Sequence, residues 1–289
     1  MTGKYFHLAG VISLLGDAHK FGMEWPDYMA PIATDFTMVE NSVLACAVAG
    51  CETIWITCND DTIPLLRYRL GDWIEDPVYI NRKSTQHYNY RKGVPIFYVP
   101  THPDDMGRRD SEAWGILSSA VTAQTVSGQI SKWTRPSAYF VSFPRGLYDL
   151  DVLRKNRNMI SSKKPFCLVD AKSSGKSFIN GERLGFTFGA EKLALLVKHF
   201  KENNVNMFKD GKKLLKEESY TGRYFSLEKT FKCLNIEDYY VKRTQFYHNI
   251  GDWDSYRNYI GSEDSGRFTR PHGSILKFRE FSRIPGENK

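Results

Sequence analysis

The sequence predicts a three-layer α/β/α fold with a mostly parallel central sheet. The opening third of the chain reads as a strand at residues 5–12, a helix at residues 39–50 and a second strand at residues 52–58. A strand, a crossover helix and a second strand form a βαβ unit, in which the two strands are parallel. Both predicted strands have almost no polar interruption, as is typical of strands buried on both faces. Strand-like and helix-like segments then alternate along most of the remaining chain.

The elements of the opening third each have a local signal. Residues 5–12 are apolar and rich enough in β-branched side chains for a buried strand. Residues 16–35 form a polar loop that contains two prolines. Thr37 and Glu40 have the spacing of a capping box, which predicts the start of the first helix, and Gly50 predicts its end.

The later elements follow from the same patterns. Apolar residues three and four apart predict helices, of which the one at 190–203 has the clearest amphipathic pattern. The helices are expected at 63–70, from 110 or 111 onwards, and at 149–157, 190–203, 227–234 and 252–259. Apolar or alternating segments predict strands at 94–99, 138–143, 166–171, 184–188 and 239–250. Without an internal repeat or an obvious linker, we expect one domain at residues 1–260, followed by a basic, aromatic tail at 261–289.

Composition is that of a well-packed globular protein. The chain has 289 residues, of which 41% are hydrophobic and 14% aromatic. No apolar run approaches the length of a membrane-spanning helix, and the first residues lead directly into a strand. We therefore expect a cytoplasmic protein with no membrane association and no cleaved signal peptide.

The five cysteines are odd in number, lie inside apolar segments and include no CxxC pair. This pattern favours buried, reduced thiols over a disulfide or a zinc site. The cysteines are Cys46, Cys51, Cys58, Cys167 and Cys233.

The net charge of +7 suggests an anionic partner, such as a nucleotide, a sugar phosphate or a polymer. Much of the excess lies at residues 209–216 and 267–283, and in the second segment arginines and lysines alternate with phenylalanines. Such interleaving is compatible with binding of single-stranded nucleic acid. We nevertheless favour a solvated basic tail whose aromatic residues pack on the domain.

Two distant parts of the chain resemble one enzyme family. The order and spacing at the N-terminal end match in Gly10, Gly16, Phe21, Pro26, Pro31, Ile32, the helix at 39–50 and the strand at 54–58. The segment 247–256, Tyr-His-Asn-Ile-Gly-Asp-Trp-Asp-Ser-Tyr, is similar to a late strand-to-helix segment of the same family. The family is that of the sugar-1-phosphate nucleotidyltransferases, or nucleotide-sugar pyrophosphorylases. The resemblance covers about residues 4–260 and implies a nucleotide-diphospho-sugar transferase-like fold.

The resemblance also implies a chemistry, from which this sequence departs. In the family, a sugar-1-phosphate attacks the α-phosphorus of a nucleoside triphosphate with the help of Mg²⁺, a Gly-rich loop with an arginine, a lysine and two aspartates. Here the loop is not Gly-rich, and the lysine is replaced by Asp27. Arg145 and Asn249 stand at or beside the positions of the two aspartates. We therefore treat Asp27, Arg145 and Asn249 as degenerate catalytic positions and expect no metal site, with Mg²⁺ only if the site has been rebuilt.

Other residues are candidates for an anion site that needs no metal. They are Gly10, Gly16, His19, Lys20, Lys172 and His248. The alternative for each charged or polar residue is a surface charge or a capping group.

Two functions remain open. The first is a divergent nucleotidyltransferase-like protein that binds a nucleotide or nucleotide sugar, with the Mg²⁺-dependent residues largely replaced; if active, it would be a sugar-phosphate nucleotidyltransferase or a related nucleotide-sugar transferase. The alternative is a non-catalytic interaction or assembly protein, built on this fold, that binds an anionic polymer or a protein partner.

Overall fold

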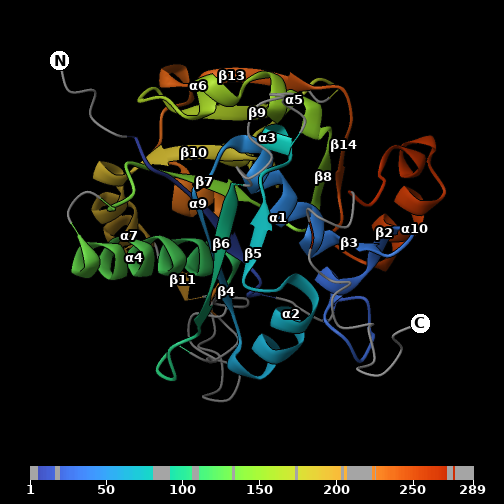
Figure 1. Cartoon of the computed structure of the whole chain (residues 1–289), viewed down its shortest axis with the longest axis horizontal. Helices are drawn as coiled ribbons and strands as arrows, with labels where there is room; N and C mark the ends of the chain where they lie inside the picture. Colours follow the sequence, from blue (N-terminus) through green and yellow to red (C-terminus); the bar gives the residue numbers. More distant parts are fainter. Residues whose placement is uncertain are drawn as a thin grey trace, which may run out of the picture.

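The computed structural model describes residues 6–16, 20–80, 92–105, 111–131, 134–172, 175–202, 205–206, 223–224, 226–271 and 276. Its centre is an eight-stranded sheet with the order β13-β9-β10-β7-β1-β4-β6-β5 (Figure 1). The strands are β1 (Leu8–Ser13), β4 (Thr53–Cys58), β5 (Trp73–Glu75), β6 (Gly93–Pro100), β7 (Ala138–Ser142), β9 (Phe166–Asp170), β10 (Phe186–Gly189) and β13 (Tyr240–Thr244). All neighbouring pairs are parallel except those made by β10 and β5. The prediction of a mostly parallel sheet is confirmed.

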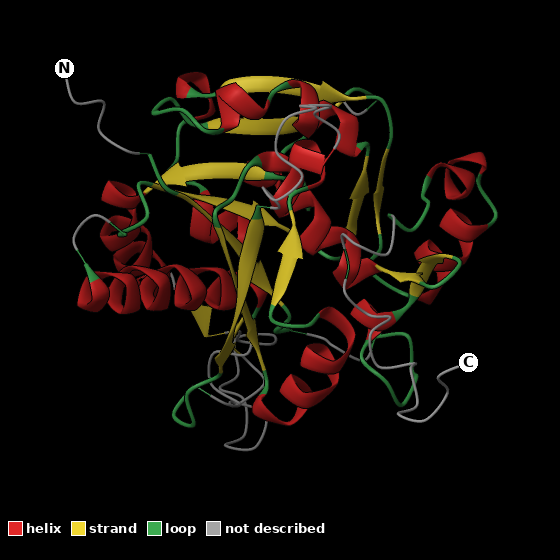
Figure 2. Cartoon of the chain, in the orientation of Figure 1, coloured by secondary structure: helices red, strands yellow, loops and turns green. Residues whose placement is uncertain are grey.

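Helices cover both faces of this sheet (Figure 2). One core forms between the sheet and a first group of helices: α1 (Met38–Ala49), α2 (Ile63–Leu70), α3 (Pro77–Ile80), α5 (Leu150–Lys155), α6 (Arg157–Ile160) and α10 (Trp253–Ile260). The opposite core contains α4 (Glu112–Ile130), α7 (Leu193–Glu202) and α9 (Leu227–Phe231). Strand β1 supplies both cores, with Ile12 on the first side and Val11 on the other. This alternation explains why the strand is apolar at nearly every position.

Helix α1 starts and ends where its sequence signals predict. The Thr37 hydroxyl accepts a hydrogen bond from the Glu40 N–H, and the Glu40 carboxylate accepts one from the Thr37 N–H at 2.8 Å. Gly50 adopts φ 99°, a left-handed conformation that ends the helix. Every residue of α1 is buried, so the helix lies at the centre of its layer.

The segment 239–250 was predicted as one strand, and that prediction is wrong. The Thr244 hydroxyl donates to the carbonyl oxygen of Phe246, and the chain turns there. The first half is β13, at the edge of the main sheet, and the second half is β14 (Tyr247–Asn249). Strand β14 pairs instead with β8 (Gly146–Tyr148), which continues from the end of β7. The turn therefore carries the late segment away from the sheet edge to the region just beyond β7.

The remaining elements are short. Two further ribbons are β2 (Pro31–Ala33) with β3 (Phe36–Thr37), and β11 (Val205–Asn206) with β12 (Arg223–Tyr224). Single turns of 3₁₀ helix lie at η1 (Asp27–Met29), η2 (Asp60–Thr62), η3 (Phe178–Asn180), η4 (Ala190–Lys192), η5 (Ile236–Asp238) and η6 (Glu263–Arg267). The turn η1 and the strand β2 fall inside the segment 16–35, which was predicted as a loop, and β3 follows directly after it.

Four of the five cysteines are buried, as predicted, and all five are free thiols. Cys233 is exposed, which corrects the expectation for that residue, because it follows the end of the short helix α9. None of the helices that the structure describes has the length and apolar character needed to cross a membrane.

Part of the predicted tail packs on the domain. The turn η6 lies against β2, and Arg270 donates hydrogen bonds to Asp35 at 2.6 Å. Leu276 is buried. The other tail residues that prompted the nucleic-acid hypothesis, 277–283, lie outside the described residues, as does the basic segment 209–216. A domain boundary at residue 260 stays a prediction.

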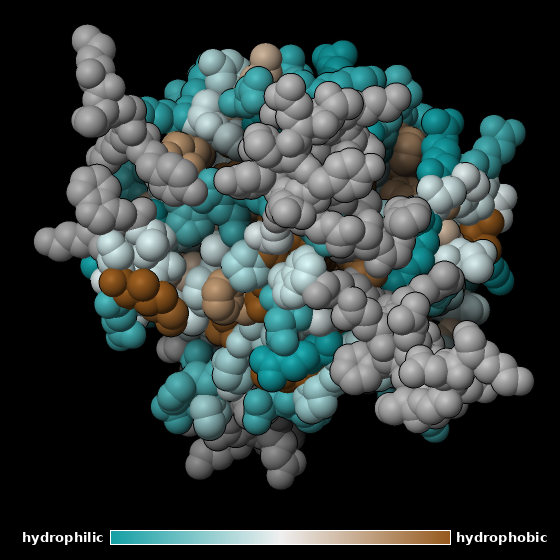
Figure 3. Space-filling model, viewed as in Figure 1, coloured by the Kyte–Doolittle hydropathy of each residue, from teal (hydrophilic) through white to brown (hydrophobic). Residues whose placement is uncertain are grey.

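One apolar area remains open on the surface. The outer side of α4 exposes Val121, Val126 and Ile130, the last at 76% of its full area. Figure 3 shows the corresponding brown region where α4 lies in Figure 1. Exposed apolar side chains of this kind are common on globular proteins, and they carry no assignment by themselves.

Candidate functional site

The carboxyl ends of the parallel strands meet at one edge of the sheet, where open α/β sheets bind their ligands. At the sheet centre, the loop after β1 and the loop after β7 enclose a narrow cleft. Its lining residues are Ser13, Leu14, Leu15, Gly16, Tyr28, Glu112, Pro144 and Arg145. The accessible space between these residues is about 10 Å³, which is about enough for a single water molecule. The cleft is therefore nearly closed by its own side chains.

Asp27 and Arg145 form a buried ion pair beside this cleft. The side chain of Asp27 is 0% exposed, and its Oδ2 lies 3.0 Å from Nη2 of Arg145. The same carboxylate accepts hydrogen bonds from the backbone N–H of Lys20 at 2.8 Å and of Phe21 at 3.2 Å. Three donors compensate for the loss of water around this carboxylate, as a buried charge requires. The pair ties the loop after β1 to the loop after β7.

The two predicted glycines have separate structural reasons. Gly16 has φ +75°, and a Cβ there would lie 3.1 Å from the backbone nitrogen of Glu112. A glycine at this position lets the loop pass close to the start of α4. Gly10 lies inside β1, where a Cβ would approach Sγ of Cys46 to 2.8 Å. The missing side chain lets α1 pack directly on β1.

A second ion pair links the cleft to the late segment. Nε of Arg183 lies 2.9 Å from Oε2 of Glu112, which lines the cleft. Nη1 of the same arginine donates to Oδ1 of Asn249 at 2.8 Å. Asn249 is thus joined to the cleft through Arg183. Glu112 and Arg183 were not predicted as site residues, because a charged residue at a helix start and another in a loop have no distinctive spacing.

His248 and Lys172 lie near a different carboxylate. Nε2 of His248 is 2.8 Å from Oδ2 of Asp264, and Nε of Arg267 is 2.7 Å from its Oδ1. The hydrogen bond with His248 lowers the pKa of Asp264, and the charges of Arg267 and Lys172 lower it further. Both predicted residues therefore surround Asp264 in η6. They do not line the cleft.

Lys20 lies on the opening loop, near the start of α10. Its backbone N–H binds Asp27, whereas its ammonium charge acts on Asp252, the N-cap of α10. The pKa of Asp252 is lowered mainly by its hydrogen bonds with Ser255, and to a smaller extent by Lys20. His19 is outside the described residues, so its predicted role cannot be placed in this geometry.

The described residues of the cleft do not fit a Mg²⁺ site. Mg²⁺ prefers carboxylate oxygens and water as ligands. The carboxylates of Asp27 and Glu112 each have an arginine within 3.0 Å. The side-chain oxygen of Asn249 accepts from Arg183. Across the described part of the chain, no group of three or more His, Cys, Asp or Glu side chains is arranged to hold a metal ion.

Comparison with solved structures identifies the architecture. A UDP-glucose pyrophosphorylase complexed with UDP-glucose aligns over 88% of this chain and 97% of its own, with a TM-score of 0.51 and 10% identity. This chain has a nucleotide-diphospho-sugar transferase-like fold. A protein assigned as a glucose-1-phosphate thymidylyltransferase from Bacillus anthracis, in complex with a sucrose, aligns over 87% and 93%, with a TM-score of 0.50 and 9% identity. No protein-family model and no curated protein matches the sequence. Identities this low show the fold alone.

Proposed function

We propose that this chain is a divergent nucleotidyltransferase-like protein that binds a nucleotide or nucleotide sugar at the cleft and lacks Mg²⁺-dependent transfer. The observation that carries the proposal is the buried pair of Asp27 and Arg145. The resemblance implies a lysine at the first position and an aspartate beside the second. This chain instead has a carboxylate on the opening loop and a cation at the end of β7. Both sites keep a charge, with the signs exchanged.

The exchange supports loss of transfer chemistry more strongly than two unrelated substitutions would. In nucleotidyl transfer, cations and Mg²⁺ stabilise the negative charge on the phosphates. A buried carboxylate on the loop contributes the opposite charge, and its partner arginine is engaged in compensating it. The ion pair therefore holds the loop against the end of β7. Its two charges fit a structural contact better than they fit the binding of a triphosphate.

A ligand role is supported by the position of the cleft and by the cations at its border. The cleft lies at the carboxyl ends of two central parallel strands, and Arg183 joins Glu112 at its rim. The solved structure with UDP-glucose has the same fold.

The small space in the cleft favours a second candidate, which is a non-catalytic interaction or assembly protein. Space for about one water molecule does not admit a nucleotide in this arrangement of the described residues. In this alternative the buried pair closes the cleft to ligands. The protein then acts through its surface, which binds an anionic polymer or another protein.

Isothermal titration distinguishes the two candidates. The full chain is titrated with nucleoside triphosphates and with UDP-glucose, each with and without Mg²⁺. The proposal expects binding that does not depend on Mg²⁺, together with no release of pyrophosphate when sugar-1-phosphate is added. Absence of binding to every nucleotide supports the interaction protein, and Mg²⁺-dependent binding with pyrophosphate release contradicts both candidates.

A triple variant tests the positional match. Asp27→Lys, Arg145→Asp and Asn249→Asp together recreate the charges that the resemblance implies, and the first two keep a buried pair of opposite sign. We expect this variant to gain Mg²⁺-dependent nucleotide affinity. A folded triple variant with unchanged affinity would show that these positions do not correspond to those of the family.

A further inference from the structure

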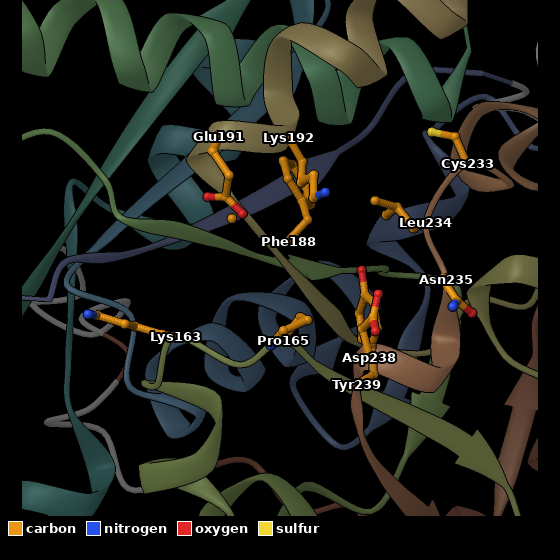
Figure 4. Close-up of a pocket in the computed structure, with 11 residues that line it drawn as sticks. Lys163, Pro165, Phe188, Glu191, Lys192, Cys233, Leu234, Asn235, Asp238 and Tyr239 are labelled. Atoms are coloured by element: carbon orange, nitrogen blue, oxygen red, sulfur yellow. The ribbon is translucent and has the colours of Figure 1, made fainter.

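A second, larger hollow lies at the opposite edge of the sheet, away from the cleft. It is formed where β9 and β13 begin and where β10 ends. The accessible space is about 200 Å³, which is below the range of about 300–1,000 Å³ for drug-sized ligands. The lining residues are Lys163, Pro165, Phe188, Gly189, Glu191, Lys192, Cys233, Leu234, Asn235, Asp238 and Tyr239 (Figure 4). A small metabolite fits these dimensions.

Four charged side chains line the hollow. Glu191 and Asp238 contribute two carboxylates, and Lys163 and Lys192 contribute two ammonium groups. Figure 4 shows Glu191 and Lys192 on one side of the hollow, with Asp238 on the other. The part of the chain that the structure describes contains no ion pair that joins any of these four side chains to another. Glu191, Asp238 and Lys192 thus place charges of both signs around the hollow, whereas the ammonium end of Lys163 points away from the other lining side chains (Figure 4).

The other lining groups include a hydrogen-bond donor. Oδ1 of Asn235 accepts a hydrogen bond from the backbone N–H of Glu237 at 3.2 Å, which leaves the amide NH₂ as the donor end. Phe188 and Leu234 also line the hollow, but at 1% and 6% exposure they present little apolar surface to it. Burial raises the pKa of Tyr239, and the charges of Asp238 and Glu191 raise it further, so both carboxylates act on the same side chain.

We propose that this hollow binds a small zwitterion that carries one carboxylate and one ammonium group, of the class of free amino acids. A simple anion would be attracted by Lys192 but repelled by Glu191 and Asp238, and a simple cation would meet the reverse, so neither gains from both sets of charges. A zwitterion satisfies both sets, with its carboxylate toward lysine and the Asn235 amide and its ammonium toward the carboxylates. This site is independent of the cleft and of any nucleotide.

The test uses calorimetric titration of the full chain with individual neutral L-amino acids at millimolar concentration. We expect at least one of them to bind. Its N-acetyl derivative and its methyl ester, each of which lacks one of the two charges, bind at least about tenfold more weakly. The double variant Glu191→Gln, Asp238→Asn loses affinity by a similar factor. Both residues are exposed, so the variant is expected to stay folded.

Glu237→Gln is the matched control, because Glu237 is exposed, precedes Asp238 and does not line the hollow. It should leave the affinity unchanged. Failure of all neutral amino acids to bind would overturn the proposal. Equal binding of the N-acetyl derivative would do so as well, as would unaltered affinity in the double variant.

Discussion

A single buried carboxylate changes the meaning of several sequence signals. Considered separately, Asp27 would repel phosphate at the position where the resemblance implies a lysine. Arg145 likewise stands beside the position where the resemblance implies an aspartate. The structure places their charged groups 3.0 Å apart, with Asp27 completely buried. Two apparent losses are therefore one contact. A buried pair of this kind gives little net stability relative to apolar residues, but removal of one partner is costly.

Asp27→Ala should lower the free energy of unfolding by about 3–5 kcal/mol, because Arg145 would remain buried without its partner. Arg145→Ala should cost a similar amount, and the double variant should cost less than the sum. Urea denaturation of the four proteins measures the coupling. Asp151→Ala, in an exposed pair with Arg154, is the control and should cost about 0–1 kcal/mol. Strict additivity of the two buried substitutions would contradict the pairing.

Asp264 gives a pH prediction. The hydrogen bond with His248 lowers the pKa of this carboxyl in the folded protein. A lowered folded-state pKa adds stability above the unfolded pKa of about 3.9, and that stability is lost as the pH falls through the folded value. Asp264→Asn should therefore be less stable than the wild type at pH 7, with the difference shrinking below about pH 4. Thermal unfolding across this range measures it, and a difference independent of pH would contradict the assignment.

At the scale of elements, β1 and α1 depend on close packing at one glycine. Gly10→Ala would place a methyl group 2.8 Å from Sγ of Cys46 and should cost about 1–3 kcal/mol by overpacking. Adding Cys46→Ala should restore only part of this loss, because it removes Sγ but leaves the Cβ of residue 46 at 2.9 Å. Gly251→Ala is the control, since a Cβ there meets nothing within 4 Å. If Cys46→Ala gives no relief in urea denaturation, the contact is not the cause.

Local signals predicted the elements that depend on local physics. The capping box at Thr37 and Glu40 and the stop at Gly50 are of this kind, as is the start of α4, where Ser111 accepts a hydrogen bond from the N–H of Trp114. Strand neighbours are set by tertiary packing, and nothing in segment 184–188 announced that β10 would run antiparallel between β7 and β9. The division of segment 239–250 also escaped prediction, because no glycine or proline marks the turn at residues 244–246.

The candidate site was predicted less completely than the fold. Gly16, Asp27 and Arg145 were named from the sequence, and the structure brings them together at the cleft. Their mutual contact was not foreseen, since Asp27 and Arg145 are far apart along the chain. Arg183 and Glu112 had no motif at all. Spacing along a sequence identifies positions, whereas pairing between positions requires the folded backbone.

At the scale of the whole molecule, the segment after α10 contacts the N-terminal part of the domain through Arg270. The Arg270 guanidinium lies 2.6 Å from Oδ2 of Asp35, and Nη2 is 3.6 Å from Oε1 of Glu40. Arg69 binds the same two acids from α2. Glu40 is completely buried, so two arginines compensate a charge that the capping box of α1 places in the interior.

Arg270→Ala should lower the free energy of unfolding by about 1–3 kcal/mol, because it removes a charged partner from a buried carboxylate. Equilibrium urea unfolding measures the effect, with Arg257→Ala as a control in an exposed pair. A loss no greater than that of the control would indicate that the segment after residue 260 is dispensable to the domain, as the predicted boundary implies.

The position of β1 also determines when the molecule can form during synthesis. This strand pairs on one side with β4 and on the other with β7, where Leu8 lies opposite Ala138. A ribosome must therefore deliver about half of the chain before the central strand gains its second neighbour, and contacts this distant in sequence slow folding. Until then one apolar edge of the nascent β1 is unpaired. Another chain or a chaperone can bind this edge in competition with correct pairing.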